Sequence, residues 1–436
     1  MMQRVVHRAG WVAAGVLGLF VVAAVAAIVR AGPLDPPAST QQTQINSLPY
    51  TISASGSYIL THDLTGAGGA NGITINAPDV TIDMRGFALV GPGGTGSEYG
   101  IYISSGSTQH IAIRNGVIRE WAGAALFDQS YQGEYDHLLF DHDGYSASAT
   151  AGIDTSNATL SDCSVSNSGG VFHPAVLLYG GSVSRCTIQY STGVGLAATG
   201  ATISDTTVSN GSMDGVQCGP CSIINATVYA NAGIGIKASD TTIGNSSIYA
   251  NTGDNVMLQE NSTLHDSAIA QSSGANGVEV VGTGVVVSRN QIGHNHLDGV
   301  FMNCCAGSGD TVEDNTVSYN QGYGVHVWQS EGAATIARNH LAGNTGIAIF
   351  LDVGGAALPL DQATEVEGND IDANGAMHGI EVDTGKNLII QNRESGSIAA
   401  GIIAAGCGGC SANTIGPVET GVTGLSNPWA NIVFPN

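Results

Sequence analysis

The stretch VSRNQIGHNHLDGVFM, residues 287–302, sets two asparagines five positions apart and follows them with a Gly-Val pair. Each asparagine comes three positions after an apolar residue, and this arrangement returns as VEDNTVSYN at 312–320, IARNHLAGN at 336–344 and VEGNDIDAN at 366–374. Glycine followed by a β-branched residue also returns, mostly every 20–25 residues, at positions 215, 235, 277, 299, 324, 379 and 401. Such a period, without helical spacing of the apolar residues, predicts a solenoid of short β-strands.

Each repeat is long enough for three short strands and three turns. The asparagines recur where the chain must bend, because asparagine tolerates left-handed backbone geometry and its amide can pair with the equivalent amide one coil above. We expect about 14 or 15 parallel coils. The β-branched residues that follow the restarts are expected to fill the interior, namely Val216, Ile236, Val256, Val278, Val300, Val325, Ile380 and Ile402. The predicted fold class is all-β, a single-stranded parallel β-helix solenoid.

Between residues 72 and 416, the repeated N-x-[IV] lines and G-[IV]-x-[VI] restarts resemble the right-handed parallel β-helix proteins of the pectin-lyase-like superfamily. The segments SLPYTISASGSYILTHDLTG (47–66) and NGITINAPDVTIDMRGFALVG (71–91) look like the opening of exported bacterial members. The resemblance implies a right-handed β-helix over 72–416, with caps at 47–71 and 417–436. It implies no activity, because this architecture supports lyases, hydrolases, epimerases and adhesins. The catalytic motifs of polygalacturonases and alginate epimerases are absent, so no catalytic residue is carried over.

The N-terminus predicts export. Arg4 and Arg8 precede an uncharged run at 11–29, and Val29-Arg30-Ala31 resembles a signal-peptide cleavage site. We interpret 1–31 as a signal peptide and 32–46 as a linker. The alternative is an uncleaved anchor that spans a membrane through 11–29. Either way the body is expected outside the cytoplasm, extracellular, at the cell surface or in the periplasm.

Composition narrows the range of partners. The chain has 12 Lys and Arg against 35 Asp and Glu, a net charge of −23. Since the body has no basic run, nucleic-acid binding is not expected. This charge also repels acidic polysaccharides, although a local site can overcome the repulsion. We expect a monomer whose partner, if it has one, is a polysaccharide or a cell-surface glycan.

Eight cysteines in an exported chain favour disulfide bonds. Two pairs would close small loops, and the third pair falls in the same column of successive coils, which suits a bridge between rungs. The expected bridges are Cys218–Cys221, Cys407–Cys410 and Cys163–Cys186. The state of Cys304 and Cys305 stays open, because a bridge between adjacent cysteines is strained. A zinc site is not expected, because the two C-x-x-C pairs lie about eight coils, roughly 40 Å, apart.

Two polar clusters suggest a metal site at first sight. His294, His296 and Asp298 alternate in the opening stretch, but they fall around a turn of the repeat, and we interpret them as a solvated turn. Residues 134–145, EYDHLLFDHDGY, hold the densest group of ionisable side chains. We align this segment with earlier repeats as an ion-pair ladder, with a cation bound among 141–143 as the alternative. The predicted ladder is Asp83–Arg114–Asp141. No metal site is predicted.

In the superfamily that this chain resembles, chemistry usually takes place on the outer face of the sheet that follows the glycine restarts. Counting along that sheet gives an outward row of Glu279, Phe301, His326, Ala348 and Glu381. A second row, two residues further on, contains Asn303, Trp328, Phe350 and Asp383. We expect Trp328 and Phe350 to stack on adjacent rungs and, with Phe301, to form a platform for sugar rings. The alternative is that a loop or the C-terminal segment covers these aromatic residues.

Acidic residues lie beside the platform. Glu381 and Asp383 are two residues apart on one strand, so their Cα atoms are about 6.6 Å apart on one face. Two carboxylates at this spacing can act as acid and base in glycoside hydrolysis. The alternatives are Ca²⁺ ligation for a lyase and a solvated acidic face. The candidate catalytic residues are Glu381, Asp383, His326 and Asp352. The candidate carbohydrate-binding residues are Trp328, Phe301, Phe350, Asn303 and Glu279. Ca²⁺ is the one cofactor that this site suggests.

Two functions fit these observations. The first is an exported β-helix that binds or processes polysaccharide, with hydrolase or lyase chemistry if it is an enzyme. The second is a non-catalytic rod for cell-surface structure or adhesion. The second is favoured by the Ser, Thr, Asn, Gly and Ala that fill most outward columns, because such residues serve solubility and little else.

Overall fold

The computed structural model describes residues 42–436 apart from 95, 105–108, 131, 304–308, 329–332, 355–360, 374, 377, 399, 405–410, 421–426 and 435–436. Throughout this part of the chain the regular structure is β-strand. No helix within it is long and apolar enough to cross a membrane. The expected signal peptide or anchor lies outside the described residues, as do the four cysteines at 304, 305, 407 and 410.

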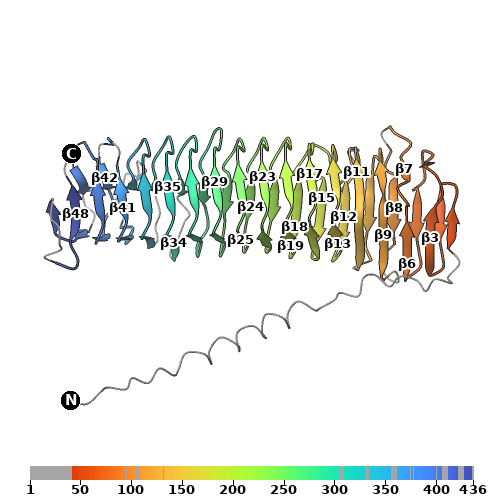
Figure 1. Cartoon of the computed structure of the whole chain (residues 1–436), viewed down its shortest axis with the longest axis horizontal. Helices are drawn as coiled ribbons and strands as arrows, with labels where there is room; N and C mark the ends of the chain where they lie inside the picture. The colour runs from red at the N-terminus through yellow and green to blue at the C-terminus, as the bar shows by residue number, and fades with distance from the viewer. Residues whose placement is uncertain are drawn as a thin grey trace, which may run out of the picture. The chain divides into compact units, whose positions relative to one another are not determined.

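Each repeat adds one strand to a parallel sheet of sixteen strands, which we call sheet B. From the N-terminal end these strands are β2 (Tyr50–Ile52), β5 (Ile73–Ile75), β8 (Tyr99–Ile103), β10 (Ala124–Asp128), β12 (Ile153–Ser156), β15 (Val176–Tyr179), β18 (Leu196–Thr199), β21 (Val216–Cys218), β24 (Ile236–Ala238), β27 (Val256–Leu258), β30 (Val278–Val280), β33 (Val300–Met302), β36 (Val325–Trp328), β39 (Ile349–Asp352), β42 (His378–Val382) and β45 (Ala400–Ala404). The strands from β5 onward agree with the predicted number of coils, and Figure 1 shows the rungs stacked along one axis.

The other 32 strands form sheet A, which bends at a further corner in each repeat. Strands before this corner are β1 (Thr43–Ile45), β3 (Gly56–Leu60), β6 (Val80–Asp83), β13 (Thr159–Ser161), β16 (Ser182–Ser184), β19 (Thr202–Ser204), β22 (Ser222–Ile224), β25 (Thr242–Gly244), β28 (Thr263–His265), β31 (Val286–Ser288), β34 (Asp310–Glu313), β37 (Ala334–Ala337), β40 (Glu365–Glu367), β43 (Leu388–Ile390) and β46 (Thr414–Ile415). Strands after it are β4 (Leu64–Thr65), β7 (Ala88–Val90), β14 (Ser164–Ser166), β17 (Thr187–Gln189), β20 (Thr207–Ser209), β23 (Thr227–Tyr229), β26 (Ser247–Tyr249), β29 (Ala268–Ala270), β32 (Gln291–Gly293), β35 (Thr316–Ser318), β38 (His340–Ala342), β41 (Asp370–Asp372), β44 (Arg393–Ser395), β47 (Val418–Thr420) and β48 (Asn431–Phe434). Strands β9 (Ile111–Arg119) and β11 (Gly133–Asp141) run through the corner and pair on both sides of it.

Apolar side chains fill the interior in the predicted register. Seven of the eight residues expected inside are at most 1% exposed, namely Val216, Ile236, Val256, Val278, Val300, Val325 and Ile380. The eighth, Ile402, packs against the same core and is partly buried. Since burying one such side chain stabilises a fold by about 1.5–3 kcal/mol, this continuous stack is the main source of stability.

A glycine directly precedes most strands of sheet B because the neighbouring rung leaves no room for a side chain. A Cβ on Gly299 would lie 2.7 Å from the carbonyl oxygen of Gly324 and 2.4 Å from Cγ1 of Val317. A Cβ on Gly324 would lie 2.5 Å from the carbonyl oxygen of Ala348. The restart therefore reflects the close approach of successive backbones at this corner.

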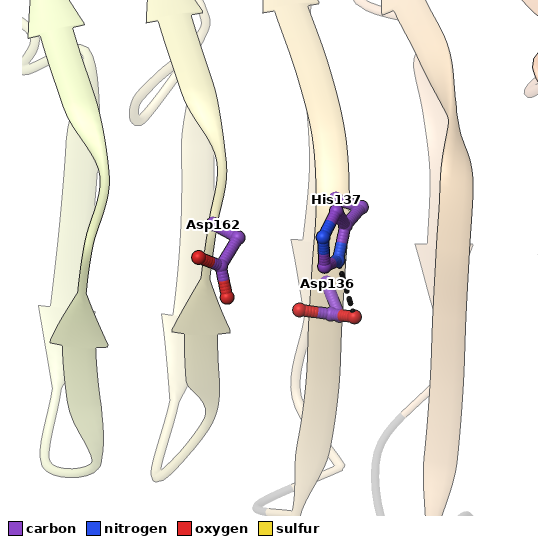
Figure 2. Close-up of side chains that lie close together, drawn as sticks. All are labelled: Asp136, His137 and Asp162. Atoms are coloured by element: carbon purple, nitrogen blue, oxygen red, sulfur yellow. Dashed lines mark hydrogen bonds and ion pairs between the residues drawn. The ribbon is translucent and has the colours of Figure 1, made fainter.

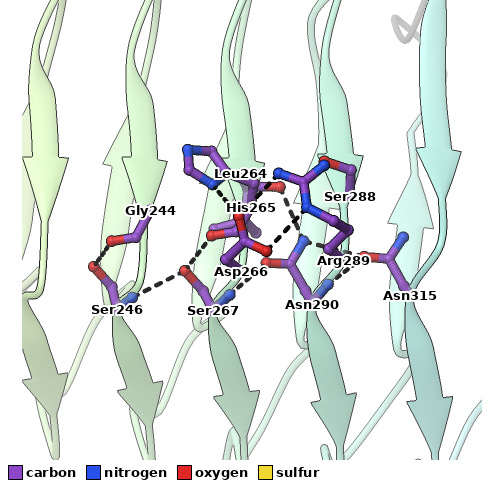
Figure 3. Close-up of polar contacts among 10 residues, drawn as sticks. All are labelled: Gly244, Ser246, Leu264, His265, Asp266, Ser267, Ser288, Arg289, Asn290 and Asn315. Atoms are coloured by element: carbon purple, nitrogen blue, oxygen red, sulfur yellow. Dashed lines mark hydrogen bonds and ion pairs between the residues drawn. The ribbon is translucent and has the colours of Figure 1, made fainter. Parts of the chain in front are cut away.

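Buried asparagines form a ladder at the corner of sheet A, as predicted. The side-chain nitrogen of Asn290 donates to Oδ1 of Asn315 at 3.1 Å and to the Leu264 carbonyl at 2.9 Å. Its Oδ1 accepts the backbone N–H of Ser267 at 3.0 Å. Figure 3 follows this column from Ser246 through Ser267 and Asn290 to Asn315. The ladder satisfies backbone groups that the bend removes from the sheet.

The left-handed residue of this corner is not the ladder asparagine but the residue before it, which corrects part of the prediction. The residue before each asparagine takes positive φ, with 55° at Arg289, 56° at Asp314 and 54° at Arg338. Its side chain points to solvent, where the guanidinium of Arg289 binds both oxygens of Asp266 at 2.9 Å (Figure 3). The left-handed residue turns the chain, which leaves Asn290 free to aim its amide along the stack.

The described cysteines divide into one bridge and two thiols. Cys218 and Cys221 form the expected disulfide, with Cα atoms 6.0 Å apart. Cys163 and Cys186 are free and buried, so the predicted bridge between rungs is wrong for this structure. They occupy the column that Asn290 holds further along, and each thiol contacts a backbone carbonyl two residues earlier, at 3.2 Å and 3.3 Å. They act there as small ladder residues.

Candidate functional site

Sheet B exposes two outward rows that contain the candidate residues. Pairing in register places five of them in the first row, in the order Glu279, Phe301, His326, Phe350 and Glu381. The second row runs Asn303, Trp328, Asp352 and Asp383. The structure therefore brings all nine candidate residues to one face over the five strands from β30 to β42.

The structure corrects the position of Phe350, which was expected beside Trp328. Strand β39 begins two residues later than expected, so Phe350 pairs with His326, and Asp352 takes the place beside Trp328. Both registers keep the apolar residues inside, because side chains alternate with a period of two. The corner before β39 distinguishes the two registers. The position that Gly324 holds just before β36 is held by the small residue Ala348 just before β39.

His326 lies between two carboxylates and is only 9% exposed. Its Nδ1 is 2.9 Å from Oδ2 of Asp298, and its Nε2 is 3.3 Å from Oδ2 of Asp352. The other oxygen of each carboxylate accepts a backbone N–H, from Tyr323 at 2.7 Å and from Gly354 at 2.8 Å. These backbone contacts hold both carboxylates, and the carboxylates hold the imidazole in one orientation.

Aromatic rings surround His326. The ring of Phe350 stacks on it at 5.4 Å and 14°, and the ring of Phe301 lies at 5.2 Å on the adjacent rung. Tyr323 meets it edge-on at 4.7 Å. Trp328 lies 6.1 Å from Phe301, tilted by 35°, and keeps part of its surface exposed. The aromatic patch on this face is therefore Phe301, Tyr323, Trp328 and Phe350.

The described residues 427–434 of the C-terminal segment do not take the covering role that was the alternative for this patch. Trp429 precedes β48, which pairs with β44 and β47 in sheet A, and its side chain is 56% exposed. The carbonyl of Pro428 accepts a hydrogen bond from Gln391 at 2.9 Å. Both residues thus lie with sheet A.

Glu381 and Asp383 face outward at the C-terminal end of the patch. Burial raises the pKa of Glu381, the charges of Asp383 and Asp352 raise it further, and His378 opposes the rise. Burial and the charge of Asp352 raise the pKa of Asp383. Carboxyl groups that disfavour one another's ionisation separate into a proton donor and a proton acceptor.

Glu279 and Asn303 lie at the other end of the patch. The side-chain nitrogen of Asn303 donates to Oε1 of Glu279 at 2.9 Å. Burial raises the pKa of Glu279 to about 6, and Asp254 adds to the rise, while Asn303 and Lys237 oppose it. This end of the patch therefore also holds a carboxyl group that keeps its proton to an unusually high pH.

Three residues of the site were not found from the sequence. Asp298 was assigned to a solvated turn, but it is buried against His326. Asp254 and Tyr323 were not assigned to the site. All three stand just before the restart of a sheet B strand, and the recurrence of Asp at that position is the signal that could have identified two of them. The turn assignment was correct for His294, which has positive φ and stacks on Tyr319 at 5.3 Å.

A second polar cluster lies on sheet A. Asp136, His137 and Asp162 bring ligand-type atoms within 4.8 Å of one another, and Figure 2 shows them on adjacent rungs. Nδ1 of His137 is 2.7 Å from Asp136, and Arg185 binds both oxygens of Asp162 at 2.6 and 2.8 Å. Since a cation already neutralises Asp162, the cluster is a surface ion-pair group.

The ion-pair ladder predicted near this cluster is correct in its first step only. Asp83 pairs with Arg114, with Oδ2 and Nε 3.6 Å apart. The next residue in the column is Asp136, whereas Asp141 pairs in register with Arg119. The prediction assigned the wrong half of β11 to this column, because that strand runs through the corner.

Comparisons with known proteins address the fold. A family model described as "Right handed beta helix region" matches residues 232–395. No curated protein matches the chain in sequence. Among solved structures the chain is similar to the A-module of mannuronan C-5 epimerase AlgE4 from Azotobacter vinelandii, with a TM-score of 0.31 and 14% identity over 86% of this chain and 90% of that one. It is also similar to the periplasmic alginate epimerase AlgG (TM-score 0.34, 10% identity, 82% and 77% covered) and to pectate lyase Pel9A (TM-score 0.33, 14% identity, 70% and 77% covered).

TM-scores and identities this low carry no argument about activity, so the function must be argued from the site itself. The backbone pairing and the matched family model agree on the architecture. The described chain folds as a parallel β-helix, and the family model that matches residues 232–395 is that of a right-handed β-helix.

Proposed function

We propose that this protein binds an uncharged polysaccharide on the outer face of sheet B, from β30 to β42, and hydrolyses it there. The observation that carries the proposal is His326, fixed between Asp298 and Asp352 at 2.9 and 3.3 Å and surrounded by aromatic rings. A structural histidine has no need of two carboxylates on an outward face. Titratable side chains that charged neighbours hold in one orientation are candidates for functional roles.

The aromatic patch supplies binding. Trp328 and Phe301 present apolar surface beside the histidine, and the C–H faces of sugar rings pack favourably on such surface. Asn303 and the carboxyl groups around it offer hydrogen bonds to hydroxyl groups. Such a mixture of apolar surface and a few polar groups is typical of ligand sites.

The charge of the site argues for an uncharged ligand. Four carboxyl groups, those of Asp298, Asp352, Glu381 and Asp383, lie at or beside His326, and a polyuronate would be repelled by them. A polyuronate would need a bridging cation such as Ca²⁺ at these acids. The net charge of −23 acts in the same direction.

The acids supply chemistry. Glycoside hydrolysis needs one carboxyl that gives a proton to the leaving oxygen and one basic group that activates the attack. Carboxyl groups with a raised pKa lie at both ends of the patch, Glu279 at one end and Glu381 with Asp383 at the other. His326 and Asp352 lie between them, so the patch can supply both a proton donor and a base.

The proposed location is outside the cytoplasm. Residues 1–31 would direct export, either as a signal peptide or as an anchor. Residues 32–46 would link this segment to the solenoid at 72–416, which with its caps would act outside the cytoplasm. The Cys218–Cys221 disulfide supports an oxidising compartment.

Turnover by the exported protein tests the proposal. Cellulose, xylan, mannan and laminarin serve as uncharged substrates and polygalacturonate as the charged one, with release of reducing ends as the measurement. Asp352→Asn, which removes a carboxylate at the centre of the patch, should reduce turnover by about 10²-fold or more, the usual contribution of an acid or base. Glu365→Gln on sheet A is the matched control and should leave turnover unchanged.

Absence of both binding and turnover on every uncharged polymer would favour the non-catalytic rod. Turnover of polygalacturonate alone, dependent on Ca²⁺, would overturn the assignment of substrate charge and assign these acids to metal binding.

A further inference from the structure

Three aspartates repeat one contact along the corner that precedes sheet B. Asp214, Asp254 and Asp298 each use Oδ1 to accept a backbone N–H from the following rung, at 2.8, 2.9 and 2.7 Å. This contact fixes each carboxyl group, because the backbone donor belongs to the solenoid itself. The rest of each carboxyl group then reaches an outward side chain of sheet B.

The outward partner differs at each aspartate. Asp214 accepts from Nε2 of Gln217 at 2.9 Å, and Asp298 meets Nδ1 of His326 at 2.9 Å. Asp254 lies beside Glu279, whose pKa is raised by burial and by the charge of Asp254. Two neighbouring carboxyl groups disfavour each other's ionisation. The pair of Asp254 and Glu279 therefore favours a proton on one of the two carboxyl groups.

The surroundings of Glu279 favour Glu279 as the group that carries this proton. Among the described residues, the polar and charged groups that face it are Asp254, Lys237 and Asn303. The Asn303 contact orients Oε1 at 2.9 Å. Glu279 is part-buried in the first outward row, in register with Phe301. Burial raises its pKa to about 6, so the protonated form is present in mildly acidic solution.

We propose that Glu279 is the proton donor of the polysaccharide site, and that the glycosidic bond to be cleaved lies over Phe301, between Glu279 and His326. This inference rests on the proposed function and gives the reacting bond a location. Glu279, Phe301 and His326 stand on three successive rungs of the first row. Rungs about 4.8 Å apart place the backbones of Glu279 and His326 roughly 10 Å apart. The side chains of Glu279 and His326 therefore lie on either side of Phe301 in the row, with the ring of Phe301 between them.

The reaction balances with water as the co-reactant. Glu279 gives its proton to the glycosidic oxygen, the bond from that oxygen to the anomeric carbon breaks, and one sugar leaves as an alcohol. Water attacks the anomeric carbon and loses a proton to the carboxylate of Asp352, which lies 3.3 Å from Nε2 of His326. His326, held on its other side by Asp298, orients that carboxylate. The proton returns from Asp352 to Glu279 through solvent.

Two substrates that differ in leaving group test this role. Glu279→Gln should reduce hydrolysis of the natural polymer by about 10²–10⁴-fold, the usual contribution of a general acid. The loss should nearly vanish on a dinitrophenyl glycoside of the same sugar, because that leaving group needs no proton. In Glu279→Gln, the fall of polymer hydrolysis at high pH that the ionisation of Glu279 causes should disappear. Asp214→Asn is the matched control, since it alters the same corner contact without facing Glu279.

A titration independent of turnover uses protein labelled with ¹³C at the glutamate carboxyl groups. A resonance with a midpoint near pH 6 should be present, and it should be missing in Glu279→Gln. Asp254→Asn should lower this midpoint, and Asn303→Leu should raise it, because the two neighbours act in opposite directions. Asp214→Asn should leave it unchanged.

Different results overturn the two proposals. An active wild type whose turnover is unaffected by Glu279→Gln, or reduced equally on both substrates, would refute the proton-donor role alone. A midpoint in the ordinary range of glutamate would refute it even if no polymer is cleaved. Failure of the wild type to bind or cleave any uncharged polymer would instead refute the proposed function.

Discussion

Replacing Asn315 with alanine should be among the most costly single changes on the outside of the core. Its Oδ1 accepts the backbone N–H of Asn290 at 2.9 Å and the side-chain nitrogen of Asn290 at 3.1 Å. Its own side-chain nitrogen donates to the Val287 carbonyl at 2.8 Å and to Oδ1 of Asn339 at 3.0 Å. Asn315 is 1% exposed, so water cannot replace these partners.

The magnitude follows from the contacts. With about 1 kcal/mol for each of the four hydrogen bonds, Asn315→Ala should lower the free energy of unfolding by about 4 kcal/mol. An unfolding entropy of about 2.1 cal/mol/K per residue over the unit Gln42–Asn436 converts this loss into a fall of about 5 °C in Tm. Asn315→Ser should cost about half as much, since Ser267 in the same column keeps the acceptor contact, at 3.0 Å to the Ser246 N–H.

Urea unfolding followed by circular dichroism measures the change. Thr316→Ala is the matched control, because Thr316 is the next residue in the same rung and its side chain is exposed. It should stay within about 0.5 kcal/mol of the wild type. If Asn315→Ala is no more costly than Thr316→Ala, the ladder does not stabilise the solenoid, and the account of the corner is wrong.

Two further predictions concern the buried residue Glu394 and the Cys218–Cys221 disulfide. Glu394 is fully buried and its pKa is raised by burial, so its contribution to stability is present at low pH and is lost as the pH rises through the raised pKa. Glu394→Gln should therefore raise the free energy of unfolding at neutral pH and leave it nearly unchanged below pH 4 (about the ordinary glutamate pKa), in urea titrations at both pH values. No such gain at neutral pH would show that Glu394 is not held against ionisation. Replacing Cys218 and Cys221 by alanine removes a loop of only a few residues and should cost about 2 kcal/mol in the same assay. A cost near zero would mean that the bridge does not constrain the unfolded chain.

The sequence predicted the solenoid well because its signal is repeated. Each restart, such as Gly299 with Val300, and each ladder residue, such as Asn290, is set by contacts with an equivalent residue on the next rung. Repetition makes such a column visible in the sequence. The repeat did not predict the register of β39 correctly. A shift of two residues keeps the same side chains inside the solenoid, so only the contact of Ala348 at the corner decides which residues pair with β36.

The site was predicted in part, and for a different physical reason. Outward residues such as His326 and Glu279 could be placed because alternation gives their direction. Asp298 and Asp254 could not, because they stand at a corner, where side-chain direction depends on turn geometry and not on a period. The free state of Cys163 likewise depends on the direction of its thiol, which points to a backbone carbonyl.

The position of the polysaccharide on sheet B is the central claim. Its most direct test is calorimetric titration of the protein with cellohexaose, xylohexaose, mannohexaose and laminarihexaose. Trp328→Ala should weaken binding of the hexaose that the wild type prefers by about tenfold or more, since stacking on an aromatic ring contributes about 1.5 kcal/mol. Phe127→Ala is the control, because Phe127 faces outward on the same sheet, at β10, where it stacks with Tyr102. The account predicts a large loss for Trp328→Ala and none for Phe127→Ala. Equal losses, or a loss for Phe127→Ala alone, would contradict it.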